Sequence, residues 1–218
     1  MAPGGSRPKG RPGPTAALEI DLACQGYALV AGVDEVGRGP LAGPVVAAAV
    51  ILPERWTDPR LDDSKRLGQA RRSELARLLA AEALAWAVGW AEKEEVDRLN
   101  IHRASLLAMR RAVEALAVQP DYLLIDGRFT LDLDMPQRAV VAGDATCRVV
   151  AAASILAKVH RDGLMQAWHR RYPEYNFAAN KGYGTLEHRQ ALERIGPCPI
   201  HRHSYQPVAQ LLLGFENG

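Results

Sequence analysis

The sequence predicts an α/β fold in which a mixed β-sheet is covered by helices. Two apolar runs of strand length, residues 29–33 and 45–52, lie on either side of a turn rich in glycine and proline. Leucines then recur at helical spacing, and a further apolar run, residues 122–125, follows a second predicted helix. Acidic residues end the first and the last of these runs, at the place where α/β folds gather their chemistry.

The composition is that of an ordinary globular protein. The 218 residues are 48% hydrophobic and 24% charged, which is enough apolar material to bury a core. No apolar run approaches the roughly 20 residues that cross a bilayer, and the first residues lack the apolar stretch of a secretory signal. The net charge of +2 and the pI of about 8.5 are compatible with nucleic-acid binding.

Residues 1–25 are predicted to form a disordered, basic tail. Residues 1–15 combine Pro, Gly and Ser with basic side chains and offer almost nothing to bury. Such a tail is either inert or holds phosphate groups without sequence preference. The three cysteines, Cys24, Cys147 and Cys198, are too few and too scattered for a disulfide framework, so we expect a reducing, cytoplasmic setting.

The first half of the chain continues with helices and one more strand. After the first two strands, Asp63 or Ser64 can cap a helix that runs on to the third strand. Residues 85–91, AWAVGWA, form a short apolar segment typical of that third strand. Residues 92–99 are predicted to form a short helix, and Asn100 can cap the helix that follows it.

The second half alternates between strands and helices. The remaining predicted elements, in chain order, are a helix at 101–117, strands at 122–127 and 139–142, a long helix at 146–171, a loop at 174–184 and helices at 186–195 and 208–213. Pro173 stops the long helix because proline cannot continue the hydrogen-bond pattern. Thr185 can cap the helix that begins at residue 186.

Four acidic residues recur in one kind of context. Asp34 and Glu35 end the first strand, and Asp126 ends the fourth. Asp144 opens the long helix that follows the fifth strand. Taken singly, Asp144 could be a helix cap, and Asp126 with Gly127 could be a turn.

All four acids together favour a metal site. Converging carboxylates repel one another unless a positive charge lies between them, and a hard divalent cation is the usual partner. Two such ions about 4 Å apart can activate water and stabilise the leaving oxygen of a phosphodiester. The pattern therefore predicts metal-dependent phosphoryl chemistry.

The turn after the first strand has two interpretations. Gly37, Arg38 and Gly39 could form a tight turn between strands, or their bare backbone and positive charge could approach a ligand. The spacing to Gly43 does not fit the dinucleotide-binding fingerprint. The position of the turn directly after the two acids favours the ligand interpretation.

The segment VDEVGRGPLAGPV, residues 33–45, resembles the signature of type 2 ribonucleases H, the ribonuclease HII family. Further matching motifs, in the family's order, are DDSKRL (62–67), LLIDGRF (123–129), GDATCRVVAAASILAKVHRD (143–162), YPEYNFAANKGYGTLEH (172–188) and HRHSYQPV (201–208). The resemblance covers about residues 28–210. Nothing in the sequence resembles the additional N-terminal domain of ribonuclease HIII.

This resemblance implies an RNase H-like fold and a defined activity. The fold would be a mixed β-sheet flanked by helices, with a catalytic core at 26–171 and a helical C-terminal extension at 172–218 that completes the substrate site. The activity would be a metal-dependent endoribonuclease that hydrolyses the RNA strand of RNA/DNA hybrids. It would also cut 5′ of single ribonucleotides embedded in duplex DNA, leaving a 3′-hydroxyl and a 5′-phosphate.

The resemblance also assigns roles to individual residues. The family's catalytic and metal-binding acids fall on the four already singled out, Asp34, Glu35, Asp126 and Asp144, which would hold two Mg²⁺ or Mn²⁺ ions with substrate bound. Its GRG motif, whose backbone reads the ribose 2′-hydroxyl, falls on Gly37, Arg38 and Gly39. Its junction-reading tyrosine falls on Tyr183, and sensing one hydroxyl is what distinguishes RNA from DNA at a single nucleotide.

Three lysines are candidate phosphate contacts. Lys65, Lys158 and Lys181 lie in the matching motifs, although each taken alone is better explained as a solvated surface lysine. We expect no chemistry from His201 or His203, whose segment is interpreted as packing of the C-terminal extension.

The expected partners are RNA/DNA hybrids and ribonucleotide-containing duplex DNA, bound by a monomer that has no contact with a membrane. A replication or repair protein could also bind through the C-terminus. Two alternatives stay open. One is another RNase H-like nuclease, such as a resolvase or transposase, and the other is a nucleic-acid-binding protein without enzymatic activity.

Overall fold

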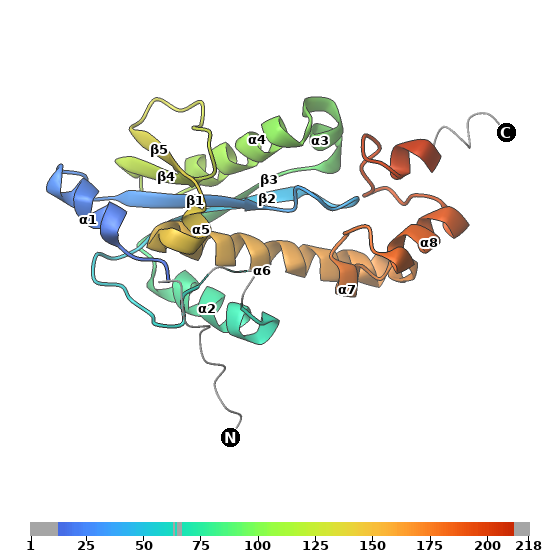
Figure 1. Ribbon diagram of the computed structural model, residues 1–218, viewed down its shortest axis with the longest axis horizontal. Helices are drawn as coiled ribbons and strands as arrows, with labels where there is room; N and C mark the ends of the chain where they lie inside the picture. Colours follow the sequence, from blue (N-terminus) through green and yellow to red (C-terminus); the bar gives the residue numbers. More distant parts are fainter. Residues whose placement is uncertain (1–12, 63, 65–66, 212–218) are drawn as a thin grey trace, which may run out of the picture.

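The computed structural model describes residues 13–62, 64 and 67–211, so the predictions for Asp63 and Lys65 lie outside the described residues. In this part of the chain the sheet has five strands, which are β1 Val30–Val36, β2 Val45–Ile51, β3 Ala85–Ala91, β4 Tyr122–Asp126 and β5 Gln137–Val140 (Figure 1). The helices are α1 Ala17–Cys24, α2 Gln69–Glu82, α3 Lys93–Leu99, α4 Ile101–Glu114, α5 Gly143–Thr146, α6 Arg148–Arg171, η1 Pro173–Tyr175, α7 Phe177–Asn180 and α8 Leu186–Ile195.

The sheet is mixed, as predicted, with the strand order β3-β2-β1-β4-β5. β1 and β2 are antiparallel, as are β2 and β3, whereas β4 runs parallel to both β1 and β5. Val33 of β1 is aligned with Ile125 of β4. The acids that follow them, Asp34 and Asp126, therefore lie next to each other at the same end of the sheet.

Helices cover both faces of the sheet. α4 packs on one face and α6 on the other, with α2 outside α6 (Figure 1). Along β2, Ala47 and Ala49 belong to the core on the α4 side, whereas Ala48 and Val50 belong to the core on the α6 side. Burial on both faces explains why this strand is a continuous apolar run in the sequence.

A glycine lets β1 approach the start of α6 closely. A Cβ atom at Gly32 would lie only 2.2 Å from the backbone carbon of Val149, so no larger residue fits there without moving the helix. This contact brings the strand that carries Asp34 directly against α6. Alignment on β4 and packing on α6 together fix the position of that carboxylate.

The C-terminal segment packs onto the turn that follows β1. Leu41 and Ala42 of the turn share a third core with Phe177 and Leu192. Ala42 also pairs with His201 in an isolated antiparallel bridge. The β1–β2 turn and the segment after α6 therefore pack together around a small core of their own. Within the described ranges, no helix is both long and apolar enough to cross a membrane.

The prediction of a disordered tail over residues 1–25 is wrong for residues 17–24, which form helix α1. Glu19 of this helix makes a buried ion pair with Arg148 of α6 at 2.8 Å, and Leu22 is also buried. Thr15 pairs with Cys147 in an isolated parallel bridge. These partners are distant in sequence, so local composition could not indicate them. Residues 1–12 lie outside the described part of the chain.

The helix that follows β2 begins later than predicted. α2 starts at Gln69, and Gly68 occupies the N-cap position without a side-chain hydrogen bond. Ser64 does not cap it, because its hydroxyl lies 2.9 Å from the hydroxyl of Ser154 on α6. Ser64 is thus attached to α6 instead of capping a helix.

The predicted long helix is interrupted near its start. Cys147 has an extended backbone and separates α5 from α6. The predicted loop at 174–184 contains the short helices η1 and α7. The predicted caps of the neighbouring elements are confirmed: Asn100 accepts two backbone hydrogen bonds at the start of α4, and Thr185 accepts one at the start of α8.

Candidate active site

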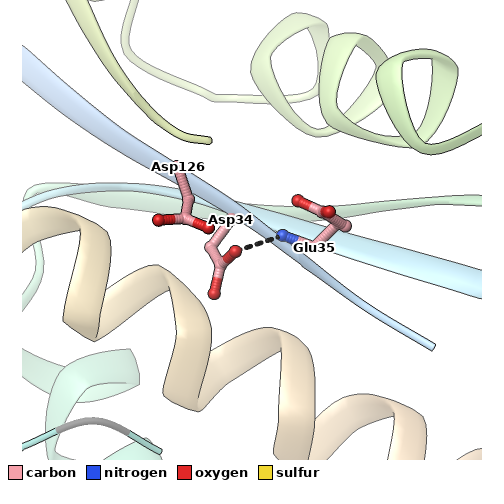
Figure 2. A group of neighbouring side chains, drawn as sticks. All are labelled: Asp34, Glu35 and Asp126. Carbon is pink, nitrogen blue, oxygen red and sulfur yellow. Dashed lines mark hydrogen bonds between the residues drawn. The ribbon is translucent and has the colours of Figure 1, made fainter. Parts of the chain in front are cut away.

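Three of the predicted acids meet at the ends of two neighbouring strands. Asp34 and Glu35 lie near the end of β1, and Asp126 is the last residue of β4. One carboxylate oxygen from each lies within 4.8 Å of the other two. Figure 2 shows Asp34 pointing to the α6 side of the sheet and Glu35 to the opposite side, as expected for consecutive strand residues, with Asp126 beside Asp34.

The fourth acid, Asp144, lies at the edge of this cluster. Asp144 is buried and is the second residue of α5, whose N-cap residue is Ala142. It is therefore not a helix cap, which was one interpretation of the sequence. Asp126 accepts hydrogen bonds from the backbone N–H groups of Gly143, at 2.8 Å, and Asp144, at 3.4 Å. The start of α5 is thereby attached to the end of β4. Asp144 is outside the group of three, but its charge helps to raise the pKa of Asp34.

The carboxylates repel one another in a buried setting. Burial raises the pKa of Asp34 well above its usual range, and the charges of Glu35 and Asp126 raise it further. Burial also raises the pKa of Glu35, although the guanidinium of Arg38, 3.2 Å away, opposes that shift. The cluster therefore favours a proton or a cation among its oxygens.

The donor set fits a hard divalent cation. Glu35 Oε2 is buried and has no hydrogen-bond partner within the described residues. Such an oxygen is costly to leave unsatisfied, and a metal ion would satisfy it. The four acids offer only oxygen ligands, which Mg²⁺ and Mn²⁺ prefer.

The turn after β1 directs its carbonyl groups into the protein. Gly37 has a φ of +94°, a conformation that favours glycine. The carbonyls of Gly37 and Arg38 accept hydrogen bonds from Arg202, at 2.6 and 3.0 Å. The hydroxyl of Tyr205 also donates to the Arg38 carbonyl, at 2.7 Å. Arg38 and Gly39 are nevertheless exposed, so this part of the turn is accessible from outside.

A second buried arginine fixes the same turn from α6. Arg161 is fully buried and donates to the carbonyls of Pro44, at 3.0 Å, Ala42, at 3.0 Å, and Lys181, at 2.9 Å. A Cβ atom at Gly37 would lie 2.2 Å from Arg161 Nε, so the arginine needs glycine at that position. Burial lowers the pKa of Arg161 to about 10, which leaves it charged at neutral pH.

Tyr183 lies directly beside the turn. Its ring carbon Cε1 is 3.4 Å from where a Cβ atom at Gly39 would be, and 45% of the residue is exposed. The two segments are joined by a hydrogen bond from the Leu41 N–H to the Gly182 carbonyl, at 2.8 Å. The side chain of Asn180 shapes the Tyr183 loop by accepting from the Gly182 N–H, at 2.8 Å. The structure therefore brings the predicted GRG turn and the predicted tyrosine together.

The predicted lysines differ from one another. Lys158 is paired with Asp162 on the next turn of α6, at 2.6 Å. Lys181 is half-buried, and burial lowers its pKa; the charge of Lys158 lowers it further, whereas Asp162 opposes the shift. Lys65 lies outside the described residues. Lys181 is therefore the described lysine that is best suited to an incoming anion.

Sequence analysis missed the two buried arginines, Arg161 and Arg202. Their partners are main-chain carbonyls of the β1–β2 turn, 117 residues from Arg161 at Pro44 and 159 residues from Arg202 at Gly43. No local pattern separates such an arginine from a surface one. Their position inside the matching motifs was the available signal.

Comparisons with known proteins agree with this arrangement. The family model described as Ribonuclease HII matches residues 31–208. The chain is 56% identical to ribonuclease HII of Pelotomaculum thermopropionicum over 192 residues, which are 87% of this chain and 72% of the relative. It is 55% identical to ribonuclease HII of Moorella thermoacetica over 190 residues, 87% of this chain and 92% of the relative.

Solved structures share the fold. The crystal structure of ribonuclease H2 from Pyrococcus horikoshii has a TM-score of 0.75 at 24% identity, covering 88% of this chain and all of that one. The PCNA:RNase HII complex from Archaeoglobus fulgidus has a TM-score of 0.69 at 22% identity, covering 82% and 96%. Bst-RNase HIII in complex with Mn²⁺ has a TM-score of 0.63 at 17% identity, covering 88% and 71%.

Proposed function

Because the chain belongs to the ribonuclease HII family of hydrolytic ribonucleases, which act on RNA/DNA hybrids, we propose that it is a metal-dependent endoribonuclease that also cuts 5′ of a single ribonucleotide in duplex DNA. The products are a 3′-hydroxyl and a 5′-phosphate. The proposal depends most on the approach of Asp34, Glu35 and Asp126 to within 4.8 Å of one another.

The acids hold the metal ions in this proposal. Asp34, Glu35, Asp126 and Asp144 would bind two Mg²⁺ or Mn²⁺ ions together with the scissile phosphate. Bound there, the ions supply activation of the attacking water and stabilisation of the leaving 3′-oxygen. Arg38 orients Glu35 through their 3.2 Å ion pair. The Mn²⁺ complex of Bst-RNase HIII, which shares the fold, supports a manganese-compatible site.

The turn after β1 reads the ribose. The carbonyls of Gly37 and Arg38 are fixed inside the protein, and the exposed backbone at Arg38 and Gly39 can be approached by a 2′-hydroxyl at close range. The ring of Tyr183 lies against Gly39 and packs on the sugar that follows the ribonucleotide. A hydroxyl sensor and a sugar platform side by side can recognise one ribonucleotide followed by DNA.

Cationic side chains bind the nucleic-acid backbone. Lys181 would contact a phosphate next to the Tyr183 loop, and Lys65 and Lys158 would contribute along the same strand. Lys158 must exchange its partner Asp162 for the phosphate, so its share of the binding energy is smaller.

The decisive experiment uses a DNA duplex that carries one ribonucleotide. The protein is incubated with Mg²⁺, with Mn²⁺ or with EDTA, and both product ends are mapped. We expect metal-dependent cleavage 5′ of the ribonucleotide, with a 3′-hydroxyl and a 5′-phosphate. Cleavage that persists in EDTA, or that falls only within longer RNA stretches, would contradict the proposal.

The same assay separates the alternatives. A resolvase-like or transposase-like nuclease would cut branched DNA in parallel reactions and would ignore the ribonucleotide. A non-enzymatic protein would bind the hybrid with no metal-dependent cleavage.

A replication partner and a cytoplasmic location complete the proposal. The Archaeoglobus fulgidus enzyme of similar fold was solved in complex with PCNA, which supports a partner at the replication machinery. We assign this contact to the C-terminus, whose residues 212–218 lie outside the described part of the chain. Deletion of these residues should abolish co-purification with the partner while cleavage in isolation is retained.

A further inference from the structure

Two buried histidines are hydrogen-bonded to each other behind the Tyr183 loop. His188 lies on α8, and His201 lies in the C-terminal segment. Both are fully buried, and their Nε2 atoms are 2.9 Å apart. The rings of Tyr175 and Phe177 contact both imidazoles.

The ends of this pair determine the direction of its hydrogen bonds. His188 Nδ1 lies 2.9 Å from the Tyr183 carbonyl, which can only accept, so Nδ1 carries the proton. The Cys198 N–H, which can only donate, lies 2.9 Å from His201 Nδ1, so that nitrogen is bare. His201 therefore donates from Nε2 to the bare Nε2 of His188. With His188 protonated at Nδ1 and His201 protonated at Nε2, each of the three hydrogen bonds has one donor and one acceptor, and both rings are neutral.

The alternative arrangement fails when both rings are neutral. A proton on His201 Nδ1 could reach the Cys198 carbonyl at 3.2 Å, but His188 would then have to donate from Nε2. Its bare Nδ1 would face the Tyr183 carbonyl, acceptor against acceptor. Burial lowers the pKa of His188, and burial with the neighbouring His188 lowers the pKa of His201 to about 3, so both rings are neutral at physiological pH.

The pair also links the two segments that surround the candidate substrate. His201 pairs through its backbone with Ala42 of the β1–β2 turn. The flanking bonds are Gly43 N–H to the Ile200 carbonyl, at 2.9 Å, and Arg202 N–H to the Leu41 carbonyl, at 2.8 Å. At one end of the pair, the backbone of His201 is thus paired with the β1–β2 turn. At the other end, His188 donates a hydrogen bond to the Tyr183 carbonyl.

We propose that His188 and His201 are positioning residues that set Tyr183 relative to the Gly37–Gly39 turn, and thereby set the preference for a single ribonucleotide. This inference rests on the proposed role of Tyr183 as the junction-reading residue. The histidines touch no substrate and act through the backbone of the loop. Their effect is on which substrate is cut, while the carboxylates that do the chemistry are unaffected.

The tautomers can be observed without any substrate. ¹⁵N NMR of the imidazoles in the full-length protein at neutral pH distinguishes protonated from bare ring nitrogens. We expect His188 to be protonated at Nδ1 alone and His201 at Nε2 alone. The opposite tautomers, or a doubly protonated ring in the pair, would overturn the inference whether or not the protein is a nuclease.

Substitutions test the consequence for selectivity. His188→Phe removes both hydrogen bonds of the His188 ring. His188→Gln keeps one side-chain donor and one acceptor at a similar separation. For His188→Phe we expect the ratio of kcat/KM on a single-ribonucleotide duplex to kcat/KM on a continuous hybrid to fall about tenfold, which is about 1.4 kcal/mol and within the range of one lost hydrogen bond. His188→Gln should restore most of the ratio.

His203→Gln is the matched control, because this exposed histidine contacts Asp97 through its backbone N–H. It should leave the ratio unchanged. An equal loss on both substrates in His188→Phe, or a ratio that His188→Gln fails to restore, would reduce the pair to a packing role. If the unmodified protein cuts only continuous hybrids, the proposed junction reading fails first, and the NMR result still decides the tautomers.

Discussion

The carboxylate cluster and the turn that follows it are neighbours on β1 but are stabilised in opposite ways. In the cluster, burial and the charges of Glu35 and Asp126 raise the pKa of Asp34, burial raises that of Glu35, and Glu35 Oε2 has no hydrogen-bond partner within the described residues. In the turn, two fully buried arginines, Arg161 and Arg202, donate hydrogen bonds to five backbone carbonyls, those of Gly37, Arg38, Ala42, Gly43 and Pro44. The first region concentrates negative charge, whereas the second has positive charge built in behind it.

This difference matches the tasks proposed for the two regions. A metal site needs ligands that stay unsatisfied until the ion and substrate arrive, so its geometry comes from the strands and helix beneath it. A sensor of one hydroxyl needs a backbone that does not move when the ligand binds, so its own polar groups are satisfied in advance. Substitutions in the cluster should therefore affect catalysis, whereas those behind the turn should affect stability and selectivity.

The largest effect should come from Asp34→Asn, which keeps the volume but removes the central charge of the cluster. We expect cleavage to fall about a thousandfold or more, because a metal ion supplies several kcal/mol and each 1.4 kcal/mol is tenfold in rate. Hybrid binding, measured by fluorescence anisotropy in Ca²⁺ or EDTA, should survive. Undiminished turnover would remove Asp34 from the proposed mechanism.

Behind the turn, Arg202→Met should mainly reduce stability. It leaves the carbonyls of Gly37, Arg38 and Gly43 without their buried donor, and we expect a loss of about 3 kcal/mol in the free energy of unfolding. Urea denaturation measures it, with the exposed Arg55→Met as the control. A stability equal to that of the control would mean that water replaces the guanidinium and that the turn is not fixed from within.

Two glycines of the turn separate stability from selectivity. Gly37→Ala combines a positive φ with a Cβ only 2.2 Å from Arg161, so we expect about 2 kcal/mol of destabilisation and slower cleavage of every substrate. In Gly39→Ala the new methyl lies 3.4 Å from the Tyr183 ring, which is ordinary contact.

For Gly39→Ala we therefore expect a stability within about 0.5 kcal/mol of the parent and a selective loss on single-ribonucleotide duplexes. Thermal melting and parallel cleavage assays measure both variants. If Gly39→Ala melted at as low a temperature as Gly37→Ala, Gly39 would be needed for the stability of the turn and not specifically for substrate selectivity.

The pH dependence of stability should reveal the repulsion in the cluster. The pKa of Asp34 is raised in the folded protein, so the metal-free fold binds this proton more tightly than the unfolded chain does. Stability from this group is present at low pH and is lost as pH rises from the ordinary aspartate pKa towards the raised one. Above that window, Asp34→Asn should be more stable than the parent in EDTA.

Added Mg²⁺ should reverse the order of those two proteins by stabilising the parent selectively, because an ion that binds the folded state shifts the unfolding equilibrium. Denaturation at several pH values, with and without Mg²⁺, measures the difference, and other titrating groups cancel between the variants. A parent that is as stable as Asp34→Asn at every pH in EDTA would argue against the repulsion.

The smallest effect should come from the lysines. Lys181→Gln should raise KM about threefold and reduce the salt dependence of binding by about one phosphate contact. Lys158→Gln should do less, because its charge is already paired with Asp162 at 2.6 Å. Binding isotherms at several salt concentrations measure both, and a larger effect for Lys158 would place the nucleic acid over α6 instead of the Tyr183 loop.

Local patterns predicted the elements of the fold that depend on local chemistry. The strand at 85–91 and the helix at 186–195 have the predicted bounds, and Asn100 caps α4 as expected. Burial of β2 on both faces made it a visible apolar run. The acids were detectable because carboxylates at the ends of separate strands have few structural explanations.

Long-range contacts determined what sequence analysis missed. Helix α1, which directly follows a segment of tail-like composition, is fixed by an ion pair between Glu19 and Arg148, 129 residues apart. The buried arginines of the turn and the His188–His201 pair bind main-chain atoms, which have no side-chain signature. The register between β1 and β4 also could not be predicted from the sequence. This alignment places Asp34 beside Asp126.

The bridge between Ala42 and His201 has a consequence for synthesis on the ribosome. All four carboxylates have left the exit tunnel long before the residues that complete the turn, Arg202 and Tyr205, are translated. A growing chain thus gains its acidic cluster early, and the residues that fix its proposed ribose sensor come last. In the proposed function, discrimination between RNA and DNA is the final property that the newly made molecule acquires.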